Sequence, residues 1–165
     1  MGMKALKLKY HIAAILKIAM YKILFGKNFC AGRRTTFRRF FNIYLEKGAM
    51  ISIGNDCFFN HGCSINALKS VKIGDACIFG ENVKIYDHNH RFVDKQVKIK
   101  DQGFTTGAVT IGNKCWFGSN VVVLKGVHIG NNCVIGAGTV INQDIPNDSI
   151  VTSGRELTIK TIIRK

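Results

Sequence analysis

The C-terminal half of the chain repeats a pattern of apolar and polar positions every six residues. From Ile111 it divides without remainder into IGNKCW, FGSNVV, VLKGVH, IGNNCV, IGAGTV and INQDIP. Each hexad opens on a large apolar residue, and four of the six place Gly second. A helix repeats about every 3.6 residues and a strand about every two, so neither alone explains this period. The repeating unit is therefore predicted to be a short extended segment followed by a turn.

Similar blocks come earlier, IGNDCF FNHGCS INALKS from Ile53 and IGDACI FGENVK IYDHNH from Ile73. Repeats this short indicate a solenoid, with three hexads forming one triangular coil. We expect the first residue of each hexad to point a large side chain inward and the fifth a smaller one. Gly followed by Asn or Asp is expected to form corners with positive φ. The residues at this corner place are Asn55, Asp75, Asn113 and Asn131.

Five of the six cysteines fall on the fifth place of a hexad. They are Cys57, Cys63, Cys77, Cys115 and Cys133, whereas Cys30 lies outside the regular repeat. Regularly stacked inward thiols act as small apolar residues. The chain has no C-x-x-C pair among them, which disfavours a metal cluster. We therefore predict that these cysteines fill the core.

The repeat is bounded by a different N-terminal segment and interrupted once. Residues 4–25 are apolar with interspersed lysines, which predicts a basic helix over 1–25. The β-solenoid is expected over 26–150 and a C-terminal tail over 151–165. The six-residue pattern stops after Ile85 and returns near Val109, so residues of about 87–108 are predicted to form an external loop.

The charge is concentrated at the N-terminus. The chain has 165 residues, 47% of them hydrophobic, which suits one domain with a single core. Of a formal net charge of +14, residues 1–50 contribute eleven Lys or Arg against one acidic residue, Glu46. Such a surface suits an anionic partner: a phosphate-bearing cofactor, a membrane or a nucleic acid.

No apolar run resembles a membrane span or a secretory signal, so we expect a cytoplasmic protein. The basic helix of residues 1–25 is expected to pack on its own protein or on a sister subunit. Peripheral contact with the inner face of the cytoplasmic membrane is the alternative.

Three segments resemble the hexapeptide-repeat acyltransferases: YDHNHRF, IGNKCWFGSNVVVLKGVHIG and IGAGTVINQDIP. The resemblance extends over about residues 26–160. It is strongest to the maltose, galactoside and xenobiotic O-acetyltransferases and to relatives that acetylate bacterial surface polysaccharides. It implies an all-β fold, a left-handed parallel β-helix with an N-terminal α-helix and a protruding loop. It also implies a homotrimer with active sites between adjacent prisms and acetyl-CoA as co-substrate.

His90 matches the catalytic histidine of this family. The resemblance implies that it acts as a general base, removing the proton from a sugar hydroxyl as that hydroxyl attacks the thioester. His88 is expected to orient its neighbour or to contact the acceptor, and Asp87 to hold an imidazole tautomer. A surface turn is the structural alternative for an isolated His-x-His, and it remains open for His88.

Asn60, thirteen residues before Ile73, falls where the sugar acetyltransferases carry an asparagine that faces the acceptor. A plain corner residue is the alternative. The cofactor-binding residues implied by the resemblance are Trp116, Gly118, Ser119 and Ala137. Trp116 could instead cap an apolar face.

The phosphate end of the cofactor is a point of departure from the family. Asn142 and Gln143 replace a common Thr-Lys, and SGRELTIK replaces an Asn-Pro-Ala-Lys-like run. We expect Arg155 or Lys160 to hold that end instead.

The leading hypothesis is an acetyl-CoA-dependent O-acetyltransferase that modifies a sugar hydroxyl in surface polysaccharide or lipid-linked sugar synthesis. A γ-carbonic-anhydrase-like enzyme needs three zinc-binding histidines with an H-x4-H pair, whereas this chain has only His88-x-His90, so no metal is expected. A non-catalytic basic scaffold or nucleic-acid binder is allowed by the charge. No zinc-finger, aromatic RNA-binding or helix-turn-helix pattern accompanies that charge, so no nucleic-acid partner is expected. The sequence leaves the acceptor and the acyl chain open.

Overall fold

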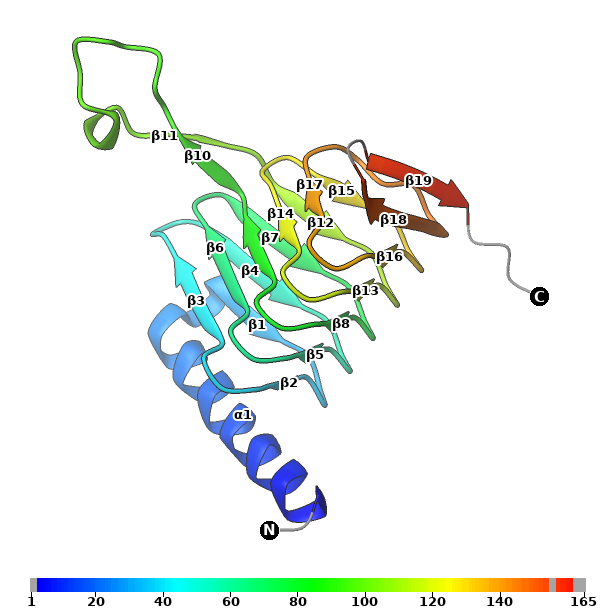
Figure 1. Cartoon of the computed structure of the whole chain (residues 1–165). Coiled ribbons are helices and arrows are strands. Elements are labelled where there is room, and N and C mark those ends of the chain that lie inside the picture. The colour runs from blue at the N-terminus through cyan, green and yellow to red at the C-terminus, as the bar shows by residue number, and fades with distance from the viewer. Residues whose placement is uncertain (1–2, 155–156, 162–165) are drawn as a thin grey trace.

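A computed structural model describes residues 3–154 and 157–161 as a three-sided solenoid with a helix across its N-terminal end (Figure 1). The helix α1 spans Met3–Phe25 and is followed by a 3-10 turn, η1, at Gly26–Asn28. The walls are three parallel sheets, except that the last strand is antiparallel to its neighbour. The predicted all-β class and left-handed parallel β-helix are confirmed.

We name the three walls sheets A, B and C. Sheet A contains β1 (Phe29–Ala31), β4 (Met50–Ile53), β7 (Ser70–Ile73), β12 (Val109–Ile111) and β15 (His128–Ile129). Sheet B contains β2 (Thr36–Phe37), β5 (Phe58–Phe59), β8 (Ile78–Phe79), β13 (Trp116–Phe117), β16 (Val134–Ile135), β18 (Ser149–Ser153) and β19 (Leu157–Thr161). Sheet C contains β3 (Asn42–Leu45), β6 (Ser64–Ala67), β9 (Lys84–Tyr86), β14 (Val122–Val123) and β17 (Val140–Ile141).

The core follows the six-residue pattern. The first residues of the six hexads are buried: Ile111, Phe117, Val123, Ile129, Ile135 and Ile141. The fifth residues are buried too: Cys115, Val121, Val127, Cys133, Thr139 and Ile145. Both predictions are confirmed, including the inward cysteines. Phe59, Phe79 and Phe117 stack face to face through the centre, with ring centroids 4.3 and 4.7 Å apart.

The corners differ from the sequence prediction. Positive φ occurs at the fourth place of the hexad, as at Asp56 (φ 57) and Lys114 (φ 57), and not at the Gly-Asn pair. The third-place residues instead bond neighbouring coils, because Oδ1 of Asn113 accepts the backbone N–H of Asp75 at 2.8 Å. The preceding glycines are required by stacking. A Cβ on Gly112 would lie 2.7 Å from the carbonyl carbon of Gly130 in the next coil.

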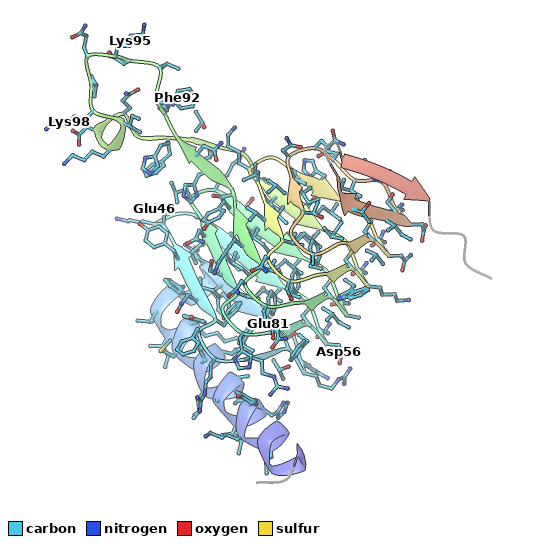
Figure 2. The ribbon with its side chains drawn as sticks, viewed as in Figure 1. Glu46, Asp56, Glu81, Phe92, Lys95 and Lys98 are labelled. Carbon is cyan, nitrogen blue, oxygen red and sulfur yellow. The ribbon has the colours of Figure 1, made fainter. Side chains whose placement is uncertain are left out.

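The chain leaves the solenoid once, between sheets C and A, and the predicted protruding loop is confirmed. This arm consists of β10 (His88–His90), η2 (Ile99–Asp101) and β11 (Phe104–Thr106), with β10 and β11 antiparallel. The chain then resumes as β12, in register with β7. Figure 2 shows Phe92, Lys95 and Lys98 on the arm, well away from the coils.

The N-terminal helix is also confirmed, and it packs Ala14 and Tyr21 against the first coil. Among the described residues, no helix has an apolar stretch long enough to cross a membrane. Where the sequence predicted only a tail from residue 151, β18 and β19 form an antiparallel pair at the edge of sheet B.

Candidate active site

A buried carboxylate anchors the base of the arm. Asp87 is fully buried, and its two oxygens accept the backbone N–H groups of Leu68 at 2.8 Å and Lys69 at 2.7 Å. Nδ1 of His88 lies 3.1 Å from Asp87 Oδ1. Because a carboxylate only accepts hydrogen bonds, Nδ1 of a neutral His88 carries the proton and Nε2 is left as an acceptor. Asp87 thus holds one imidazole in a defined tautomer, and that imidazole belongs to His88.

His90 lies two residues further along β10, so it shares a face of the strand with His88. Its side chain is exposed, and within the described protomer it makes no hydrogen bond or ion pair. Its ring packs on Phe104, the cross-strand partner, at a centroid distance of 4.5 Å. The ring of His88 meets the same phenylalanine edge-on at 5.3 Å. Phe104 therefore packs on both histidines at the root of the arm.

The four described residues expected to bind the cofactor line one groove. This groove has a volume of about 320 Å³, and its lining includes Trp116, Gly118, Ser119 and Ala137 together with Gly80. Trp116 is 55% exposed and forms part of the wall. A Cβ on Gly118 would lie 2.5 Å from the backbone nitrogen of Ala137, so a glycine is needed where the coils meet. Small residues leave backbone accessible along this corner.

Glu81 is a residue of this corner that the sequence did not single out. Its carboxylate lies 3.3 Å from Nδ2 of Asn60 and 3.4 Å from Oγ of Ser119 (Figure 2 labels Glu81). The three residues form a polar row across three coils, ending at the groove. Glu81 lies 21 residues after Asn60 and 38 residues before Ser119, because the arm lengthens only the coil between Glu81 and Ser119. No constant spacing therefore reveals the row in the sequence.

One protomer does not bring the two groups together. His90 and His88 lie at the corner between sheets C and A, where the arm leaves. The groove and Asn60 lie at the corner between sheets B and C, and the width of sheet C separates them. Arg155 falls outside the described residues. Lys160 belongs to β19, but its side chain falls outside the described part of the chain.

The cysteines of the repeat point into the core and away from both corners. The five cysteines of the repeat are buried, and burial raises the pKa of the Cys63 thiol to about 11. A thiol must ionise to act as a nucleophile, so Cys63 is poorly suited to that role. Across the described residues, no three His, Cys, Asp or Glu side chains are arranged to hold a metal ion.

Comparison with known proteins identifies a transferase family model and similar acetyltransferases. The family model "Bacterial transferase hexapeptide (six repeats)" matches residues 108–143. The chain is 36% identical to galactoside O-acetyltransferase of Escherichia coli K12 over 112 residues, 68% of this chain and 54% of that protein. It is 30% identical over 139 residues to a putative lipopolysaccharide biosynthesis O-acetyl transferase, WbbJ, of the same organism, covering 78% of this chain and 66% of that one. The chain thus spans less than two thirds of the length of both relatives.

The fold is also found among solved structures. A galactoside acetyltransferase in complex with coenzyme A superposes with a TM-score of 0.68 at 27% identity, covering 98% of this chain and 78% of that one. The similarity therefore extends along nearly the whole solenoid rather than a few repeats. The chain belongs to the hexapeptide-repeat family of acyltransferases.

Proposed function

We propose that this protein is an acetyl-CoA-dependent O-acetyltransferase that acetylates a sugar hydroxyl in bacterial surface polysaccharide or lipid-linked sugar synthesis. The observation that carries the proposal is the groove beside Trp116, where four residues expected from the family line one corner. The similar galactoside acetyltransferase was solved with coenzyme A. The relative WbbJ is named for lipopolysaccharide biosynthesis. We further propose that the reaction takes place on the cytoplasmic side of the membrane.

In the proposed mechanism His90 is the general base. Its imidazole takes the proton from the sugar hydroxyl as the hydroxyl oxygen attacks the thioester carbonyl. The C–O bond forms, the C–S bond breaks, and the imidazolium returns its proton to the departing CoA sulfur. No acyl-enzyme is needed. His88, held by Asp87, is a positioning residue that shares the Phe104 contact with His90.

The groove is proposed to hold the pantetheine arm. Trp116 offers an apolar wall, and Gly118, Ser119 and Ala137 allow the chain of the cofactor to approach the backbone. Arg155 or Lys160 is proposed for the phosphate end. Asn60 is proposed to face the acceptor, with Glu81 holding its side chain in place at 3.3 Å.

A complete site requires a second copy of the chain, because His90 and the groove lie at different corners. The homotrimer proposed here would place the arm of one protomer beside the groove of the next. The outward row of sheet B begins at Thr36 and is then apolar and in register over five strands, which suits such a contact: Phe58, Ile78, Trp116, Val134 and Ile150. The corresponding row of sheet A is mostly polar: Cys30, Ser52, Lys72, Thr110 and His128.

The test is thiol release from acetyl-CoA in a screen of sugar and glycan acceptors. His90→Ala is expected to lower kcat by about a hundred- to ten-thousandfold. Cys30→Ser, at an exposed cysteine outside the groove, is the matched control and should retain the parental rate. A folded His90→Ala variant that acetylates at the parental rate would exclude His90 as the base.

Mixing two inactive variants tests whether each active site is shared between two protomers. His90→Ala and Ala137→Trp are each expected to be inactive, the first for lack of a base and the second because its indole fills the groove. Mixed oligomers of the two should regain activity, because some sites then combine an intact His90 with an intact groove. If mixing restores no activity although mixed oligomers form, the site lies within one protomer.

A further inference from the structure

The helix α1 has an apolar face that the solenoid does not cover. Its inner side buries Ala14 and Tyr21 against the first coil. The opposite side exposes large apolar side chains: Leu8 (60%), Ile12 (50%), Ile15 (55%), Leu16 (66%) and Ile23 (84%). Their spacings of three, four and seven place them on one helix face, which we call the outer stripe. A continuous exposed stripe of this kind marks an interaction surface.

Cations flank the outer stripe. Lys9 and Lys22 are exposed and lie on either side of it. Arg33 and Arg39, on the first coil, line grooves against the same helix, and Arg34 lies beside them but is paired with Asp56. Residues 1–45 contain ten Lys or Arg and no Asp or Glu. The surface around α1 is therefore strongly positive.

Phe40 extends the apolar surface at a conformational cost. It is 74% exposed, and it lines a groove with Lys9, Ala13 and Arg39 beside α1. Its φ of 62° lies in the left-handed region, which is unfavourable for a bulky side chain. The equivalent corner places elsewhere hold glycine or smaller or polar residues such as Ala76, Asn82 and Gly138. A phenylalanine that is mostly exposed in a strained corner gains little from its own fold, which favours an external contact for its ring.

We propose that the outer stripe and Phe40 dock on the surface of an anionic lipid bilayer. The apolar side chains enter the boundary between headgroups and acyl chains, while Lys9 and Lys22 lie among the phosphates. A second copy of the chain fits this face less well, because two copies meeting through it would bring two strongly positive surfaces together. α1 lies across the N-terminal end of the solenoid, away from the arm, so docking leaves the arm free (Figure 1).

The experiment is flotation of the full chain with vesicles of phosphatidylcholine alone or of equal parts phosphatidylcholine and phosphatidylglycerol. The parent should float with the anionic vesicles and bind the neutral ones weakly. Ile12→Glu with Ile23→Glu should lower partitioning at least about tenfold, since two apolar anchors are lost and negative charge is added. Ile99→Glu, the same change at a residue of the arm that is 57% exposed, should bind like the parent.

Phe40→Asn separates docking from folding. Asparagine tolerates the left-handed corner, so this variant should unfold at the same or a higher temperature while binding anionic vesicles several-fold more weakly. Its circular dichroism and its thiol release with a soluble acceptor should match the parent.

Three results would overturn the docking proposal: no binding of the parent to anionic vesicles, undiminished binding of both variants, or a change in oligomer mass for Ile12→Glu with Ile23→Glu. The last result would make the outer stripe a contact between copies. The proposed acetyl transfer is measured separately with soluble acceptor, so either proposal can fail without the other.

Discussion

Replacing Asp87 by Asn tests the buried carboxylate at the base of the arm. The carboxylate accepts three hydrogen bonds, from Leu68, Lys69 and His88, and an amide has only one oxygen to offer. If the amide oxygen faces the N–H of Leu68, the amide nitrogen faces the N–H of Lys69. The buried N–H of Lys69 then has no acceptor, at a cost of about 1–3 kcal/mol. The remaining bonds also lose their charge, which weakens each by roughly half.

We therefore expect Asp87→Asn to lower the free energy of unfolding by about 3 kcal/mol. Urea denaturation followed by circular dichroism measures this loss. Asp101→Asn is the matched control, because Asp101 is exposed on the arm and the same change there should stay within about 0.5 kcal/mol.

The catalytic part of the prediction depends on His88. If Asp87 acts by holding that imidazole, then Asp87→Asn and His88→Ala should lower kcat to similar levels, and the double variant no further, because effects of linked residues are not additive. Lowered stability with parental turnover in the folded fraction would mean that Asp87 only anchors the backbone at residues 68–69.

Three further predictions concern the core and the groove. Burial raises the pKa of the Cys63 thiol from 9.0 to about 11, so this thiol ionises first in the unfolded chain, and its contribution to the free energy of unfolding should fall as pH rises between those values. Cys63→Ala should therefore reduce the pH dependence of the urea midpoint across that window, and an unchanged dependence would contradict the raised pKa. Phe79 stacks between two phenylalanine rings at 4.3 and 4.7 Å, so Phe79→Ala should cost about 4 kcal/mol in unfolding, and a loss below about 1 kcal/mol would show that the column collapses to fill the space. Ala137→Leu narrows the groove beside Trp116 at an exposed position, so the KM for acetyl-CoA should rise about tenfold with little change in melting temperature, and an unchanged KM would place the cofactor elsewhere.

The inward and outward assignment of side chains could be predicted from the sequence, because alternation along an extended segment is local. A residue such as Ile111 or Cys115 is placed by its own hexad, without knowledge of the rest of the fold. The N-terminal helix was predictable for the same reason. The corner conformation was predicted one place too early. Position 112 requires glycine because the backbone of the next coil lies against it, whereas the residue with positive φ is Lys114.

The candidate site was predictable by residue but not by arrangement. Matching motifs singled out His90, Trp116 and Asn60, but the separation of His90 from the other two across sheet C could not be predicted from those motifs. Glu81 was missed because its partners lie 21 residues before it and 38 residues after it. Contacts between coils depend on how much chain each coil contains, and the arm changes that length once.

The amino-acid sequence alone determined the six-residue period, the buried positions, the basic N-terminal helix and the place where the chain leaves the solenoid. These features follow from side-chain size and local backbone preference. Only the tertiary structure decided that Asp87 holds His88 rather than His90, that Phe104 packs on both histidines, and that α1 keeps an uncovered apolar face. Each of these features depends on which segments the stacking of the coils brings into contact. No local pattern in the chain encodes which distant segments meet.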